Sequence, residues 1–275
     1  MKGTTFSLET APMIDFASVS LPTILFASIA VLLAAAEIGH LFGSRAVGEA
    51  NVSTLEAAIL GLMALMIGFT FSMALSRFDA RRDAVLNEAN AIGTAALRAR
   101  LLPAPHDAES VRLLRDYTRI RLDFTRSVMT PGEADAAIAR SNEIQEALWL
   151  RAKSVAAKDN AMVPTGIYIQ SLNEIFDDQQ KRLTALRNRV PNIVFFALYA
   201  IAAVSLGFTG YASGLEARRW RLPVYIMSVL AAGVILLIQD IDRPGAGFIS
   251  VSQQPMIDTA ASLAGYVAKF DGRAP

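Results

Sequence analysis

The residues best suited to chemistry in this sequence are few and far apart. Glu37 and His40 have the Glu-x-x-His spacing that di-iron helical bundles use in two copies, together with further carboxylates. The only other histidine, His106, lies in a proline-rich connection and has no such partner. The sequence contains no cysteine, so thiolate metal sites and disulfides are excluded. We therefore predict no metal and no other cofactor, and we interpret Glu37 and His40 as a polar pair at the end of an apolar segment.

Catalytic patterns are missing as well. Neither histidine has the serine elbow or the acidic companion expected of a nucleophilic triad. The sequence Gly245-Ala246-Gly247 has no preceding strand and no Lys-Ser/Thr pair, so it does not match a phosphate-binding loop. Because the formal net charge is only +1, there is no general basic surface to attract nucleic acid. The sequence thus predicts neither an enzyme nor a nucleic-acid-binding protein.

Charged residues gather instead beside apolar segments. One compact group is basic and aromatic, and it consists of Arg218, Arg219, Trp220 and Arg221. A tryptophan at this place suits the aromatic belt of a membrane interface, and the arginines suit lipid phosphates. The alternative is a mouth that attracts anions.

A second charged group has two parts, each of which directly follows an apolar segment. If both parts lie at one membrane depth, they can form an interhelical ionic network. The alternative is a solvated collar of charges. The first part contains Arg77, Asp79, Arg81, Arg82 and Glu88, and the second contains Asp240, Asp242 and Arg243.

Four apolar segments are long enough to cross a bilayer, which takes about 20 residues. They run approximately over 16–36, 55–75, 192–212 and 222–238 in a chain that is 53% hydrophobic. Pro22 falls in the first third of the first segment, where a kink is tolerable because neighbouring helices can satisfy the freed carbonyl. No ionisable residue lies in the middle of a segment, which disfavours a proton relay or a charge-coupled carrier. A passive pathway lined by hydroxyl, carbonyl and apolar groups remains compatible.

Small residues recur every three or four positions along the second apolar segment. Such a stripe favours close packing against another helix. The alternative is a pore-lining face with a hydrophobic constriction, to which Phe69, Thr70 and Phe71 would contribute. The stripe consists of Ala57, Gly61, Ala64, Gly68, Ser72 and Ser76.

Helical periodicity dominates the long polar region between the second and third segments, and no strand is predicted. Prolines and capping residues divide this region into helices over 77–102, 108–128, 131–158 and 165–190. Pro255 opens a last amphipathic helix, which we expect near the membrane surface or against the bundle. The predicted fold is an all-α integral membrane protein, with transmembrane pairs in 1–76 and 191–239, a helical domain in 77–190 and a tail in 240–275.

Lysine and arginine near the spans indicate the orientation. With four spans, both termini and the helical domain share one side, and that side carries most of these residues, so we predict that it is cytoplasmic. The basic cluster in the short loop before the fourth span opposes this assignment. The residues compared are Lys2, Arg77, Arg81, Arg82, Lys181, Arg182, Arg187, Arg189 and Arg243 on the first side, and Arg45, Arg218, Arg219 and Arg221 on the other.

Two blocks of sequence resemble the bestrophin-like membrane domain of many bacteria. One is residues 68–82 (GFTFSMALSRFDARR) with 88–94 (EANAIGT), and the other is residues 240–244 (DIDRP) with 251–256 (VSQQPM). The resemblance implies a distant likeness to bestrophins, which are pentameric anion channels with a cytosolic helical domain between the second and third of four spans. The sequence lacks a clear counterpart of the bestrophin calcium-binding acidic cluster and of its full neck motif.

Two functional hypotheses follow. In the first, the chain forms a homo-oligomeric inner-membrane channel that passes small anions and is surrounded by membrane lipids. In the second, it is a non-conducting membrane scaffold or sensor whose cytoplasmic domain binds a partner. The residues that would line the pore or pack between helices are Ala64, Gly68, Phe69, Phe71, Ser72 and Ser76.

Overall fold

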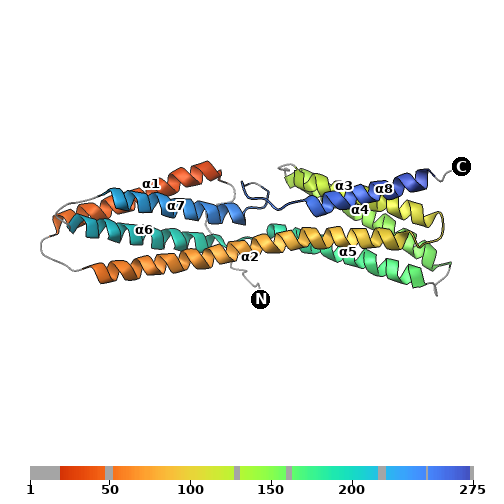
Figure 1. The fold of residues 1–275 in the computed structure, drawn as a ribbon, viewed down its shortest axis with the longest axis horizontal. Coiled ribbons are helices and arrows are strands. Elements are labelled where there is room, and N and C mark those ends of the chain that lie inside the picture. The colour runs from red at the N-terminus through yellow and green to blue at the C-terminus, as the bar shows by residue number, and fades with distance from the viewer. Residues whose placement is uncertain are drawn as a thin grey trace, which may run out of the picture. The chain divides into compact units, whose positions relative to one another are not determined.

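The part of the chain that the structure, a computed structural model, describes consists of helices joined by short connections (Figure 1). Described are residues 19–46, 52–126, 131–158, 163–215, 221–245 and 247–272. The helices are α1 (Leu21–Arg45), α2 (Ser53–Ala99), α3 (His106–Arg126), α4 (Pro131–Ala156), α5 (Val163–Arg187), α6 (Asn192–Leu215), α7 (Leu222–Asp242) and α8 (Gln254–Asp271).

These helices form two compact units. The first comprises Met1–Ser76 and Arg189–Arg243, and the second comprises Arg77–Asn188 and Pro244–Pro275. Helix α2 contributes to both. Four helical stretches among the described residues have the length and apolar composition of membrane spans, and each overlaps one of the four segments predicted from the sequence. The predicted all-α membrane architecture is therefore confirmed.

The spans begin and end at different residues than predicted. Helix α1 starts at Leu21, and the Ser20 hydroxyl caps it by accepting a 3.3 Å hydrogen bond from the Thr23 N–H. Pro22 therefore lies in the first helical turn, where proline needs no hydrogen-bond partner, so α1 has no kink to accommodate at this residue. Helix α1 also runs on to Arg45, and α7 runs on to Asp242, because polar residues at the membrane surface continue each helix beyond its apolar run.

Glycines bring α1 and α6 into close contact in the first unit. A methyl group added at Gly39 would lie within 3.0 Å of the Gly207 backbone, and one at Gly210 would meet the Ala36 backbone as closely. Gly43 and Gly214 are equally tight. Because only glycine leaves room for the facing backbone, this pair of helices depends on its glycines. Helix α7 packs beside both, and Tyr199 of α6 links to Ser28 at 2.6 Å.

The second unit is a helical bundle with an apolar core. Its core contains buried side chains of α2, α3, α4, α5 and α8, including Ile92, Leu114 and Leu172. Helix α8 buries Met256, Leu263 and Val267, so the tail helix lies against the bundle, which was one of its two predicted places. An exposed ion pair of 2.6 Å between Arg112 and Asp271 ties its end to α3.

Candidate functional site

The membrane part of α2 is the least covered of the four spans. Only 17% of its apolar window is buried within the chain, compared with 39% for α7. Its exposed positions recur at helical spacing and thus form one continuous face. We call this face, which consists of the exposed residues of 53–76, the bare face of α2. The small residues predicted as a stripe all belong to it: Ala57, Gly61, Ala64, Gly68, Ser72 and Ser76.

No helix of the described chain packs against the glycines of the bare face. A methyl group added at Gly61 or Gly68 would meet nothing within 4 Å. Phe69 also belongs to the bare face and is 61% exposed. Phe71 is half-buried and Thr70 is fully buried, with its hydroxyl donating to the Met66 carbonyl at 2.8 Å. The choice between a pore lining and packing against a second copy therefore concerns contacts outside the single chain.

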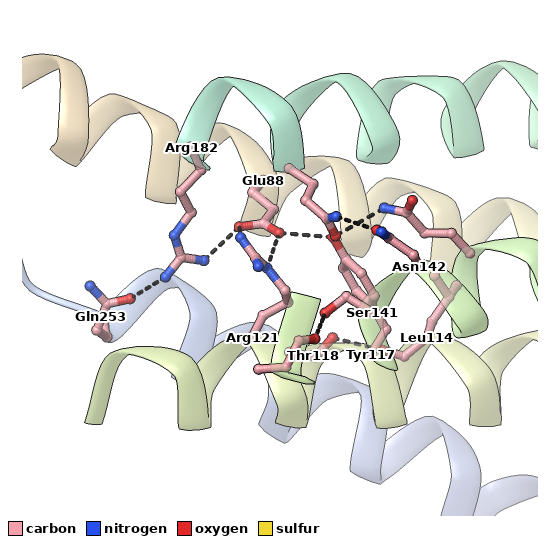
Figure 2. Close-up of polar contacts among 12 residues, drawn as sticks. Glu88, Leu114, Tyr117, Thr118, Arg121, Ser141, Asn142, Arg182 and Gln253 are labelled. Atoms are coloured by element: carbon pink, nitrogen blue, oxygen red, sulfur yellow. Dashed lines mark hydrogen bonds and ion pairs between the residues drawn. The ribbon is translucent and has the colours of Figure 1, made fainter. Parts of the chain in front are cut away.

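A buried charge network centres on Glu88, in the part of α2 that belongs to the second unit (Figure 2). Arg121 of α3 donates from Nε to Glu88 Oε1 at 2.7 Å, and Arg182 of α5 donates from Nη1 to Oε2 at 2.5 Å. All three side chains are at most 1% exposed. The second Arg182 nitrogen donates to Gln253, directly before α8, at 2.9 Å. One carboxylate thus holds α2, α3 and α5 together, and Arg182 extends the network towards α8.

Neutral polar groups complete the network. The Tyr117 hydroxyl lies 2.9 Å from Glu88 Oε1 and 2.8 Å from the side-chain oxygen of Gln179. The Gln179 amide also meets Asn142 and Gln145 of α4, at 2.9 Å and 3.0 Å. Every helix of the second unit except α8 therefore contributes a side chain that lies in this hydrogen-bonded group.

The electrostatics keep Glu88 ionised. Burial alone would raise its pKa, but the adjacent positive charges of Arg121 and Arg182 outweigh burial and hold the pKa below its usual value. Burial raises the pKa of Tyr117 well above its usual range, and the negative charge of Glu88 adds to this rise. For Arg182, burial lowers the pKa, while Glu88 opposes that effect. Glu88 is thus a carboxylate, Tyr117 is a neutral phenol, and the network is a structural clamp on α2.

The sequence interpretation placed Glu88 in a group of juxtamembrane charges and did not find its partners. That placement was wrong, because Glu88 is fully buried and pairs with α3 and α5. A signal was present in the spacing: Arg121 follows buried Leu114 by seven residues and Arg182 follows buried Ile175 by seven. Positions seven apart share a helix face, so both arginines lie on the buried faces of their helices.

The rest of the predicted ionic network divides between the two units. In the first unit, Asp240, Asp242 and Arg243 are buried, and the Asp242 carboxylate accepts from the Val190 N–H at 3.0 Å. The remaining residues begin the second unit, where Arg81 is buried, Arg77 is half-buried, and Asp79 and Arg82 are exposed. A direct network between the two parts stays a prediction.

Three of the four residues in the predicted basic-aromatic cluster, Arg218, Arg219 and Trp220, lie outside the described residues. Arg221 is described, and its guanidinium lies 3.5 Å from the Glu37 carboxylate. His40 is buried one turn after Glu37. Within the described ranges, no group of three or more histidine and acidic side chains could hold a metal ion.

The family model for the Bestrophin-like domain matches residues 20–256, which is most of the chain. The protein belongs to the Bestrophin-like family. Several solved structures share its fold, as expected for a family member. Among curated proteins, no sequence matches.

The solved structures include a bacterial bestrophin homologue from Klebsiella pneumoniae and several of its single-site variants. The first aligns with a TM-score of 0.64 and 14% identity, over 93% of this chain and 100% of the homologue. Two variants align with TM-scores of 0.67 and 0.65, over at least 92% of this chain and 99% of theirs, at 14% and 15% identity. At such low identity the likeness establishes the fold, and the multi-pass membrane architecture of this Bestrophin-like protein agrees with it.

Proposed function

We propose that this Bestrophin-like protein is a homo-oligomeric channel that passes small anions through a path lined by the bare faces of α2 from several copies. The observation that carries this proposal is the contrast between α2 and its neighbours. Helix α2 is the longest helix described, yet its apolar half is the least covered by the rest of the chain. Something outside the single chain must therefore cover it, and family membership favours further copies of the chain.

The residue types of the bare face suit a mixture of pore lining and subunit contact. Gly61, Gly68 and Ser72 are small or hydroxylic, so they leave room along an axis and offer polar groups to a partly dehydrated anion. Phe69 is large and exposed, as a hydrophobic constriction requires. Phe26 and Phe42 of α1 are at least as exposed as Phe69, and we assign them to the lipid-facing surface because α1 lacks an exposed stripe of small residues as long as that of α2.

The second unit would hold the pore helix in place. The Glu88 network fixes α2 to α3 and α5 through two charge-assisted contacts in a dry core. We place this unit and both termini in the cytoplasm of a bacterial cell and the spans in its inner membrane, from the distribution of lysine and arginine. A reporter fused after Pro275 tests that orientation: it should be active in the cytoplasm, and activity outside would reverse the assignment.

The rival proposal is a non-conducting scaffold or sensor. Exposed apolar side chains on the second unit, such as Trp149, Leu150 and Phe248, offer contact surface for a partner. In that case the bare faces of two copies would pack tightly and leave no axial path. The oligomeric state in detergent separates the proposals, because a ring of several copies favours the channel and a dimer favours the scaffold.

The direct test is anion flux in liposomes that contain the purified full-length protein. Chloride release should exceed that of empty vesicles by at least about tenfold, and Phe69→Ala should change it because it widens the constriction. Phe42→Ala, on the exposed surface of α1, is the matched control and should conduct as the wild type does. Release at the level of empty vesicles from a properly folded oligomer would overturn the channel proposal.

A further inference from the structure

Helices α1, α6 and α7 of the first unit line a small pocket that the channel proposal does not use. Its lining includes Glu37 and His40 of α1, Gly210 and Ser213 of α6, and Arg221 and Tyr225 at the start of α7. The free space is about 10 Å³, room for one group the size of a water molecule. One side of the pocket is formed by the close contact of α1 and α6, where the backbones of Ala36 and Gly210 pack together.

Acidic, basic and neutral polar groups meet at this pocket. The Glu37 carboxylate accepts a hydrogen bond from the Tyr225 hydroxyl, and its other oxygen lies 3.5 Å from Arg221 Nη1. His40 is only 3% exposed, and its Nδ1 has no hydrogen-bond partner among the described residues. A buried ring nitrogen without a partner is costly, so its position at an open pocket indicates a missing hydrogen-bonding group.

The pocket lies where lipid headgroups are expected. Helix α1 has 25 residues, about 37 Å at 1.5 Å per residue, which exceeds the roughly 30 Å hydrocarbon core. Its last turns therefore enter the headgroup layer, and Arg221 immediately precedes α7. Towards the middle of the bilayer, both helices carry exposed apolar side chains, including Val31 of α1 and Ile226 and Val229 of α7. These side chains offer a surface for the acyl chains of a lipid.

We propose that this pocket binds the headgroup of a phospholipid with a primary ammonium, of the phosphatidylethanolamine type. An ammonium group is about the size of a water molecule and has three donors, so it can donate to the Glu37 carboxylate and to His40 Nδ1. The phosphate of the same lipid meets Arg221, which is half-exposed at the rim. One negative and one positive side chain at the pocket thus match the two charges of a zwitterionic headgroup.

The same chemistry disfavours other lipids. A choline headgroup carries three methyl groups on its nitrogen, so it is too large for this space and cannot donate a hydrogen bond. A phosphatidylglycerol headgroup has no cation and would leave its negative charge beside Glu37. The assignment depends on the membrane location of the first unit and does not depend on ion conduction.

Native mass spectrometry of the full-length protein tests this proposal. The protein in detergent is mixed with phosphatidylethanolamine, phosphatidylcholine or phosphatidylglycerol of identical acyl chains. The detergent is then removed in the spectrometer, and the lipid molecules that stay bound to the protein are counted. Retention of phosphatidylethanolamine should exceed that of either other lipid by about tenfold. Equal retention of all three lipids, or preference for phosphatidylglycerol, would overturn the proposal. Free phosphoethanolamine should not compete at equal concentration, and effective competition would assign the site to a soluble ligand instead.

Variants locate the site. Glu37→Gln and His40→Leu should each abolish the preference for phosphatidylethanolamine, while Glu56→Gln, an acid in the first turn of α2, should retain it. Size-exclusion and circular dichroism profiles confirm that each variant is folded, and the comparison of lipids on the wild type needs no variant. A preference that survives both Glu37→Gln and His40→Leu would place the lipid elsewhere and refute this pocket as its site.

Discussion

The two halves of α2 carry similar small residues in different surroundings. In the second unit, Ala89, Ala95 and Ala96 are at most 2% exposed and pack in the bundle core. In the membrane half, a methyl group added at Gly61 or Gly68 would have no other atom within 4 Å. A small residue on a helix therefore marks a contact only where the chain supplies a partner helix. The bare face of α2 needs a partner or solvent from outside the chain.

The largest loss of stability should come from a substitution in the half of α2 that belongs to the second unit. Glu88→Gln leaves the buried Arg121 and Arg182 without their carboxylate, and we expect a loss of about 3–5 kcal/mol in the free energy of unfolding. Thermal or denaturant unfolding of the purified protein measures this loss. Asp83→Asn, on an exposed position of the same helix, is the control and should stay within about 0.5 kcal/mol. Equal stability of the two variants would mean that the network does not clamp α2.

The next largest loss of stability should come from a glycine of α1 that packs against α6, compared with a glycine on the bare face of α2. Gly39→Ala forces a methyl group into the Gly207 backbone and should cost about 1–3 kcal/mol or separate α1 from α6. Gly61→Ala, on the bare face, should leave the stability of the single chain within about 0.5 kcal/mol. Melting temperatures in detergent compare the two. A larger loss for Gly61→Ala in a monomeric preparation would show that the bare face packs within its own chain.

Acid should lower the stability that the Glu88 network gives to the second unit. The pKa of Glu88 is lower in the folded protein than in the unfolded chain, so its contribution to stability is complete above the unfolded value, about 4.3. That contribution is lost as pH falls below this value towards the folded pKa. Unfolding of the wild type should therefore become easier below about pH 4.3, with a smaller acid dependence in Glu88→Gln. Identical pH profiles for the two proteins would contradict the assigned pKa direction.

The smallest effect concerns the exposed ion pair that holds the end of α8. The Arg112 and Asp271 side chains are 44% and 58% exposed, so Arg112→Ala should cost only about 0.2–1 kcal/mol. Addition of salt should remove most of this difference. A loss of several kcal/mol in the same unfolding assay would show that α8 depends on this ion pair more than on its buried apolar residues.

The sequence predicts the spans well because length and hydrophobicity alone decide whether a helix can cross a bilayer. Helix ends are less predictable, since Pro22 fits either a kink or a first turn until the capping by Ser20 is known. The glycines of α1 and α6 were not singled out, whereas the stripe on α2 was. Spacing alone does not distinguish these cases, because the partner of a glycine is fixed by tertiary packing.

The candidate site was likewise predictable only in part from the sequence. Residue types located the bare face of α2, but its exposure became visible only once the other spans had been placed against each other. The Glu88 network was missed because three helices far apart in sequence supply its charges. Similarly, the sequence identifies Glu37 and His40 as polar neighbours, while their pocket requires Tyr225 of α7 and Arg221 directly before that helix.

The central claim is that the bare face of α2 borders water in an assembly of several copies. The chain has no cysteine, so Ser72→Cys on this face and Val31→Cys on the exposed surface in the middle of α1 each introduce a single thiol. In liposomes, a charged water-soluble thiol reagent should modify Ser72→Cys and reduce chloride flux, while Val31→Cys should remain unmodified in lipid. Modification of Val31→Cys alone, with Ser72→Cys unreactive, would contradict the account.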